Sequence, residues 1–203
     1  MTAADHRHVE PAPDGREIVH PTTRKQWRAW LAKHHARTEG VWVASYRTGT
    51  GKPRVEYDEI VEEALAFGWI DSRAKTLDED RSLLWLAPRR RTSGWSKSNK
   101  ARVARLERDG LMTDAGRRVV EEAKASGAWT LLDSVEALEV PEDLAEALSS
   151  SETAQRHFGA FPDSSKKIIL TWIATAKRDE TRKRRILETV RLAAENKRAN
   201  HRP

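Results

Sequence analysis

Two short stretches of this chain combine side chains that can bind anions. In the first, PRRRTSGWSKSN at residues 88–99, the candidate site residues are Arg89, Arg90, Trp95, Ser96 and Asn99. Arginine offers a planar fork to phosphate or carboxylate, and serine and asparagine add neutral donors. The same residues also suit a helix cap packed on a tryptophan. The stretch therefore predicts capping and packing, recognition of an anionic or phosphorylated ligand, or contact with single-stranded nucleic acid through tryptophan stacking.

The second stretch, ATAKRDETRKRRI at residues 174–186, is unusually basic. Between its first lysine and its last arginine there are six basic and two acidic residues. The candidate anion-binding residues here are Lys177, Arg178, Glu180, Arg182 and Arg185. The two acidic residues could neutralise the cations internally, or the cations could bind an anion or a nucleic acid. All three interpretations stay open at this point.

The apolar pattern around the second stretch predicts a break between two helices. On one straight helix, the apolar stripe that precedes it would continue into Glu180 and Lys183. Burying an unpaired Glu and Lys is costly. Asp179 is a good N-cap, so we predict two helices that meet near Arg178 and Asp179. The second helix would bury Ile186, Leu187, Val190 and Ala194. Free N–H groups at its beginning would add to the basic character of the site.

An acidic residue, Asp71, is expected to face these basic groups. In the sequence GWIDS it follows an apolar pair that opens a strand, and alternation places it on the opposite side from Ile70. A carboxylate on a small sheet needs a partner. The sequence predicts either a structural ion pair with an arginine such as Arg89 or Arg182, or a polar pocket floor between the sheet and the C-terminal helices.

The remaining motifs give no catalytic centre. There is no cysteine, which excludes disulfides, thiolate catalysis and cysteine-ligated zinc. The chain contains neither a G-x-S-x-G nucleophile turn nor an H-E-x-x-H zinc motif. Paired carboxylates such as Glu62 and Glu63 are expected to be solvated, and His157 to be partly buried in packing. We therefore predict no catalytic residue, no metal and no cofactor. An enzyme acting on a phosphorylated or carboxylated metabolite remains an alternative.

Composition predicts a folded protein with acidic partners. Eight tryptophans supply large buried surfaces, although 33% of the residues are charged. The formal net charge is +6, and the two basic stretches together hold more than this excess. An anionic small molecule or an acidic protein is the expected partner, and nucleic acid is a further possibility. No apolar run is long enough to span a membrane, and the first residues lack the apolar core of a secretory signal. Membrane insertion is not expected, and the predicted location is cytoplasmic.

The helices and strands that the sequence predicts around these residues indicate an α+β fold. Residues 40–47 are rich in β-branched and aromatic residues and predict a strand, and residues 69–88 predict a β-hairpin with an acidic turn. Helices are expected before, between and after these strands. We predict a small antiparallel sheet of about three strands with packed helices, followed by a helical C-terminal half. The predicted organisation is a tail at 1–16, an α+β domain at 17–135, a C-terminal helical subdomain at 136–197 packed on that domain, and a tail at 198–203.

Six motifs in a fixed order resemble a known family. They are FGWIDS, PRR, WSKSN, GLMTDAG, GAW and AKRDETRKRRI, beginning at Phe67 and ending at Ile186. The series is similar to the YdeI/OmpD-associated (OmdA-type) family, often labelled bacteriocin-protection proteins, and the resemblance runs from about Trp27 to Arg198. It implies a role in resistance to bacteriocins or cationic peptides. It provides no reaction, cofactor or catalytic residue that could be carried over. The expected function is a non-enzymatic stress-protection protein whose basic pocket holds an anionic ligand or acidic partner.

Overall fold

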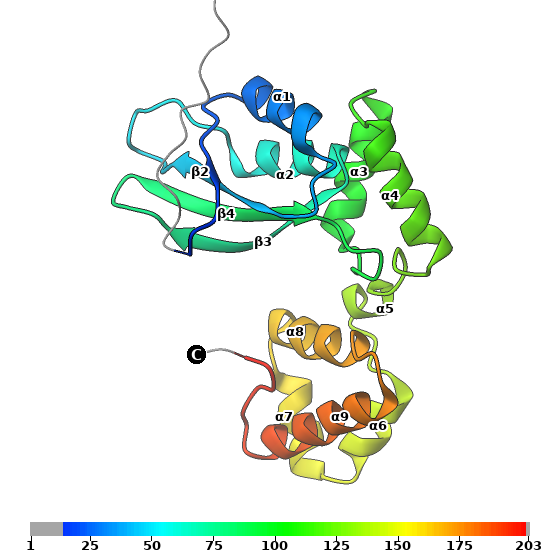
Figure 1. Ribbon diagram of the computed structural model, residues 1–203. Coiled ribbons are helices and arrows are strands. Elements are labelled where there is room, and N and C mark those ends of the chain that lie inside the picture. The colour runs from blue at the N-terminus through cyan, green and yellow to red at the C-terminus, as the bar shows by residue number, and fades with distance from the viewer. Residues whose placement is uncertain (1–13, 202–203) are drawn as a thin grey trace, which may run out of the picture. The chain divides into compact units, whose positions relative to one another are not determined.

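The computed structural model describes residues 14–201. These residues form four strands and nine helices, and every strand lies in the N-terminal half (Figure 1). The predicted α+β class is therefore confirmed. Residues 1–13 and 202–203 lie outside the described residues, and with them most of the predicted N-terminal tail and the end of the predicted C-terminal tail.

The sheet contains one more strand than the sequence predicts. Its order is β1-β2-β4-β3, and its strands are β1 (Ile18–Val19), β2 (Val41–Tyr46), β3 (Trp69–Thr76) and β4 (Arg81–Pro88). The pairs β2–β4 and β3–β4 are antiparallel as predicted, whereas β1 pairs with β2 in parallel. The sheet is thus mixed. Two residues are too few to show the alternation that identifies a strand, which explains why β1 was missed.

Strand β3 lies at one edge of the sheet. Its register with β4 shifts between Asp71 and Arg73, so the strand carries a bulge. Beyond the bulge its side chains are exposed. The hairpin turn follows at residues 77–80, where the Asp78 carboxylate accepts hydrogen bonds from the backbone N–H and the guanidinium of Arg81. The acidic turn that the sequence predicts is therefore closed by its own basic neighbour.

Four helices belong with the sheet: α1 (Arg24–His34), α2 (Tyr57–Ala66), α3 (Lys97–Arg108) and α4 (Asp114–Ala125). Helices α1 and α2 lie on one face of the sheet (Figure 1). The Trp27 indole N–H donates to the Ile60 carbonyl at 3.0 Å, which joins α1 to α2. Trp30 stacks on Trp27 and meets Trp69 edge-on. Tryptophans at helical spacing therefore form this part of the core.

The opposite face of the sheet is covered by cations stacked on tryptophan. Trp42 and Trp85 are cross-strand partners with ring centroids 5.1 Å apart. Arg73 lies over both rings, and Lys75 lies 5.1 Å from the Trp42 ring centroid. The Trp85 ring also contacts Arg16, at 4.6 Å. Long basic side chains cover apolar rings on a solvent-facing surface in this way.

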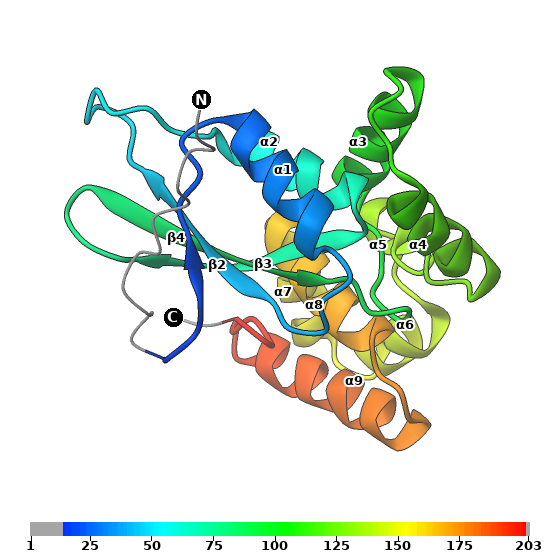
Figure 2. The same ribbon diagram turned by 45° about the horizontal axis from the view of Figure 1, so that its top comes forward.

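Five helices form the C-terminal part: α5 (Asp133–Glu136), α6 (Glu142–Ser149), α7 (Glu152–Ala160), α8 (Asp163–Ala174) and α9 (Asp179–Ala194). Helix α9 contacts α6, α7 and α8 (Figure 2). Its buried neighbours include Leu144, Phe158, Ile169 and Ile173. His157 is partly buried, as predicted, and its ring nitrogen Nδ1 lies 2.8 Å from the Ala193 carbonyl oxygen.

The chain divides into two compact units. Among the described residues, one comprises residues 14–93 together with Ser98–Ser126, and the other comprises Gly94–Lys97 together with residues 127–201. We call them the sheet unit and the helical unit. The domain boundaries expected from the sequence, at residues 16, 135 and 197, stay predictions. Within residues 14–201, every helix is too short or too polar to cross a lipid bilayer.

Candidate functional site

The predicted break between the last two long helices is confirmed. Helix α8 ends at Ala174 and α9 begins at Asp179. The N-cap is Arg178, in extended conformation and without a side-chain capping bond, rather than Asp179 as predicted. Asp179 and Glu180 lie instead in the first turn of α9, where carboxylates favour the positive end of the helix dipole. We call residues 175–185 the α8–α9 corner.

The buried stripe of α9 differs from the predicted one. Ile186 is buried, but Leu187 is 67% exposed, and the stripe continues through Thr189 and Ala193. Residues 186, 189 and 193 also have helical spacing, so periodicity alone could not separate the two stripes. The Thr189 hydroxyl donates to the Arg185 carbonyl at 2.8 Å, which satisfies its polar group in the core. Val190 is partly buried, and Ala194 is exposed. The predictions that Leu187 and Ala194 are buried were therefore wrong.

Two of the predicted site arginines hold α9 to its neighbours. Arg182 donates from Nε and Nη2 to the two carboxylate oxygens of Asp143 on α6, at 2.6 and 2.9 Å. This bond to Arg182 lowers the pKa of Asp143, and the same bond raises the pKa of Arg182. Arg185 donates to the Trp172 carbonyl and lies over the Trp172 ring. Both side chains thus form contacts inside the helical unit.

The Asp143–Arg182 pair predicts a pH-dependent contribution to stability. Asp143→Asn should lower the free energy of unfolding at neutral pH by up to about 1 kcal/mol, because the pair is partly exposed. A carboxyl with a depressed folded pKa stabilises above its ordinary value of 3.8, and this stabilisation is lost as the pH falls through the folded pKa. The deficit of the variant should therefore shrink below pH 3.8. Urea unfolding across this range measures it, with Glu146→Gln on the same helix as control. A deficit that is unchanged in acid would contradict the assignment.

Four other cations at the α8–α9 corner are exposed and have no partner. Within residues 14–201, no side-chain hydrogen bond or ion pair involves Lys177, Arg178, Lys183 or Arg184. Helical spacing places Lys183 and Arg184 on either side of the exposed Leu187. The corner therefore presents a cationic surface with one apolar side chain, defined by these four cations and Leu187. We call it the α9 surface.

The sheet unit assembles a second group of predicted site residues around a tyrosine. The Tyr57 hydroxyl, at the beginning of α2, donates to Asp71 on β3 at 2.8 Å. Burial and this hydrogen bond raise the pKa of Tyr57 to about 12. Arg89, which follows β4, is 7% exposed, and burial lowers its pKa to about 10 while the charge of Asp71 opposes the shift. At neutral pH Tyr57 keeps its proton and Arg89 its charge, so the group can donate hydrogen bonds but provides no general base from Tyr57.

Asn99 joins this cluster through an arginine. Arg102 donates to the Asn99 side-chain oxygen at 3.2 Å and to Asp58 at 2.6 Å, and its charge also acts on Tyr57. Tyr57 and Arg102 were missed by the sequence analysis. The only signal for Tyr57 is its place at the first turn of a helix that must pack on the strand bearing Asp71.

Three further predicted site residues lie in the segment between β4 and α3, and the tryptophan among them is packed in the core. Trp95 is 1% exposed, and its ring centroid lies 4.9 Å from that of Trp129. A base or ligand ring could therefore stack on Trp95 only if the surrounding residues moved. Ser96 immediately precedes α3, and Arg90 is exposed. Stacking on Trp95 receives no support from this geometry.

A network of buried charges contradicts one expectation directly. Glu62 and Glu63 on α2 are buried rather than solvated. Glu63 accepts from Arg24 and from Arg28 on α1, both at 2.6 Å, and Glu62 pairs with Arg24 and with Arg105 on α3. The prediction failed because the partners lie about forty residues away in sequence, outside the window in which helical patterns are read.

Eight of the eleven predicted site residues thus fall into two groups. Asp71, Arg89 and Asn99 belong to the sheet unit, whereas Lys177, Arg178, Glu180, Arg182 and Arg185 lie at the α8–α9 corner. Arg90, Trp95 and Ser96 belong to neither group. Their union in one pocket stays a prediction. Among residues 14–201, no three His, Asp or Glu side chains come together as a metal site would require.

Comparison with protein families finds one match in each part of the chain. Residues 137–196 match the family described as "Bacteriocin-protection, YdeI or OmpD-Associated" (OmdA). Residues 19–119 match a family described as a domain of unknown function, DUF8412. No curated protein and no solved structure matches the chain.

The OmdA match confirms the predicted family for the segment that contains the α8–α9 corner. The sequence motifs predict the resemblance from about Trp27 to Arg198, whereas the OmdA match itself covers residues 137–196. All of α6–α9 lies within this segment, including the α9 surface. The Tyr57 cluster lies in the part that matches DUF8412. The OmdA match suggests a bacteriocin-protection or YdeI-type function.

Proposed function

We propose that this is a non-enzymatic, cytoplasmic bacteriocin- or stress-protection protein that acts by binding an acidic protein partner through its α9 surface. The observation that carries the proposal is a set of four exposed cations at the α8–α9 corner, inside the segment that matches OmdA, which have no side-chain partner among residues 14–201. Two of them, Lys183 and Arg184, flank the exposed Leu187. Many arginines and lysines elsewhere form an ion pair with a nearby carboxylate, as Arg191 does with Glu188 and Glu195. The excess charge at the corner is therefore available to a partner.

The chemistry of this surface favours an acidic peptide over a small anion. A small anion needs converging donors, but Arg182 and Arg185 already bind Asp143 and Trp172. Lys183, Arg184 and Leu187 lie one helical turn or less apart and present two charges beside an apolar side chain. A helix with acidic residues around an apolar one is complementary to this pattern. Charged rims increase association rates, and the buried apolar contact prolongs the complex.

Binding to a model acidic peptide tests the proposal. We expect a fluorescein-labelled helical Glu/Leu peptide to bind the full chain at low salt, with affinity that falls as salt rises. Lys183→Ala/Arg184→Ala should weaken binding about tenfold, because two exposed charges are removed. Leu187→Ala should also weaken it. Fluorescence anisotropy measures both effects.

A matched control separates this surface from net charge. Arg108→Ala/Arg118→Ala removes the same charge from exposed positions on α3 and α4, and should leave the affinity nearly unchanged. If both double variants lost the same affinity for the peptide, binding would depend only on the net charge of the protein, and the proposed surface would be wrong. Binding of inorganic phosphate that competes fully with the peptide would instead assign the corner to a small anion.

Nucleic-acid binding is the second candidate, and the cation-covered sheet face favours it. Arg16, Arg73 and Lys75 could contact phosphates, while Trp42 and Trp85 lie beneath them. Trp42 is fully buried, so a base could stack on it only after the cations moved aside. A labelled oligothymidylate in the same assay distinguishes the two candidates. If it binds with a steep salt dependence while the acidic peptide does not bind, nucleic acid becomes the preferred partner.

A further inference from the structure

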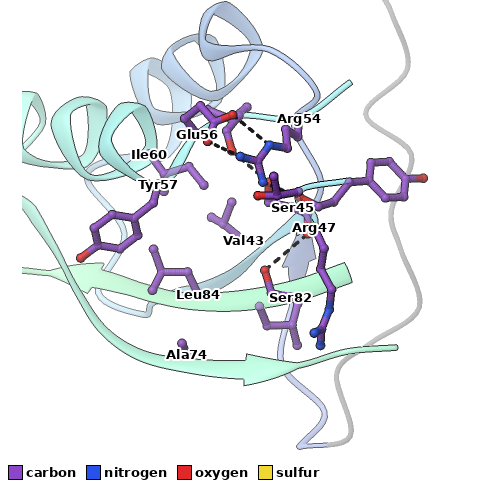
Figure 3. A pocket seen from close by; sticks show the side chains of 14 residues that line it. Val43, Ser45, Arg47, Arg54, Glu56, Tyr57, Ile60, Ala74, Ser82 and Leu84 are labelled. Carbon is purple, nitrogen blue, oxygen red and sulfur yellow. Dashed lines mark hydrogen bonds and ion pairs between the residues drawn. The ribbon is translucent and has the colours of Figure 1, made fainter. Parts of the chain in front are cut away.

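A cavity in the sheet unit lies apart from every residue that the proposed function uses. Its volume is about 600 Å³, within the range of small-molecule pockets. It lies between one face of the sheet and the chain that enters α2 (Figure 3). Figure 3 shows Val43 and Leu84 facing Ile60 across it, with Ala74 below. Its central walls are therefore apolar.

Two cross-strand rows on one face of the sheet form the floor of the cavity, and short side chains in the second row leave it open. On the face that carries Val43, one row pairs Val43 with Leu84 and Leu84 with Ala74. The next row contains only short polar side chains, with Ser45 opposite Ser82 and Ser82 opposite Thr76. Larger residues at these positions would fill the space below α2. Ala74, which the helices do not cover, is exposed.

The polar groups of the cavity are divided between its two ends. Figure 3 shows Tyr57 at one end and Arg47 with Ser82 at the other. The Tyr57 hydroxyl donates to Asp71, so its polar atom is already engaged. Arg54 is held by Glu56 through two hydrogen bonds, which neutralise it. The polar end of the cavity therefore depends on Arg47.

Arg47 is the cation at this rim whose charge stays uncompensated. Its guanidinium donates to the Thr76 hydroxyl at 3.0 Å, and among residues 14–201 it forms no ion pair with a carboxylate. The other basic groups nearby are paired, Lys52 with Asp80 and Arg81 with Asp78. An apolar cavity with one uncompensated positive charge at its rim is complementary to an amphipathic monoanion.

We propose that this cavity binds a small amphipathic carboxylate. Its hydrocarbon body would lie between Val43, Leu84 and Ile60, and its carboxylate would accept hydrogen bonds from the Arg47 guanidinium. The site is independent of the α9 surface, since its lining residues all belong to the sheet unit. Failure of one proposal therefore leaves the other standing.

Decanoate tests the proposal on the full chain below its micellar concentration. Isothermal titration calorimetry should show saturable binding to one site, and decyltrimethylammonium, with the same chain and the opposite charge, should bind at least about tenfold more weakly. In ¹H–¹⁵N spectra decanoate should shift the amide signals of Val43 and Leu84. Equal affinity for both amphiphiles, or no shift at these amides, would overturn the proposal.

Two variants and one control locate the ligand. Arg47→Gln should weaken decanoate binding about tenfold by removing the charged donor, and Ala74→Phe should abolish it by filling the cavity with a side chain that suits a strand. Lys75→Gln removes the same charge from the opposite face of β3 and should leave the affinity unchanged. Circular dichroism verifies that each variant is folded. Undiminished binding by folded Ala74→Phe would place the ligand elsewhere and contradict the proposed site.

Discussion

Replacing Glu63 with alanine should destabilise the sheet unit by about 3 kcal/mol. The Glu63 side chain is 3% exposed and accepts from both Arg24 and Arg28, each at 2.6 Å. Without this carboxylate, the two arginines at the α1–α2 contact lose the counter-ion that they share, at a position where water has limited access. Because these arginines keep about a third of their side-chain exposure, water can compensate in part. We therefore expect a loss of stability at the lower end of the range that is typical when one partner of a buried ion pair is removed.

Urea unfolding of the full chain, followed by tryptophan fluorescence, measures this loss. Glu121→Ala is the control, since Glu121 on α4 is exposed and pairs with Lys124 one turn further along the same helix. Surface substitutions of this kind change stability by about 0.5 kcal/mol or less. The stability of Glu63→Gln should lie between those of Glu63→Ala and Glu121→Ala, because glutamine keeps the shape of the side chain and still accepts hydrogen bonds but carries no charge. A Glu63→Ala variant as stable as the control would show that the network contributes no net stability.

The second large effect is expected at Gly116 on α4. A β-carbon there would lie 2.3 Å from the Ala66 carbonyl oxygen and 2.8 Å from the Met112 methyl carbon. The Ala66 carbonyl cannot easily move, because it accepts from both the backbone N–H and the hydroxyl of Thr113. Alanine favours a helix over glycine by about 1 kcal/mol, but the clash with backbone should outweigh this. Gly116→Ala should be destabilised by about 2 kcal/mol in total.

A second helical glycine provides the matched comparison. A β-carbon at Gly159 on α7 would lie within 4 Å only of the adjacent residues and the backbone of its own helix. The same substitution there gains helix propensity without a clash, so Gly159→Ala should raise stability by about 0.5–1 kcal/mol. Thermal and urea unfolding of the two variants should therefore change in opposite directions. A change of the same sign in both would mean that α4 can move away from α2 at little cost.

Sequence reasoning succeeded where the pattern was local. Alternation around the acidic turn predicted the hairpin, and a conflict between the apolar stripe and Glu180 predicted the break before α9. Both predictions depended on residues that are close to each other in the sequence. The short β1 strand was missed because pairing of two residues with β2 leaves no periodic signal.

The rest depended on contacts that no local pattern contains. Burial of Glu63 is set by Arg24 and Arg28 on another helix. Tyr57 gains its role from Asp71, which lies on a strand that begins only after α2 has ended. The cavity arises from Ser45 and Ser82, which become neighbours only when β2 pairs with β4. Each of these features needed the register of the sheet or the packing of helices, neither of which the sequence displays.

The bulged edge strand β3 also bears on the solubility of the protein. An unpaired strand edge is a template on which a second molecule can extend the sheet. Here the irregular register between Asp71 and Arg73, followed by exposed Arg73 and Lys75, works against such growth by distorting the backbone and repelling a like strand. The cations that shield tryptophan on this sheet therefore also help the molecule to resist fibril formation.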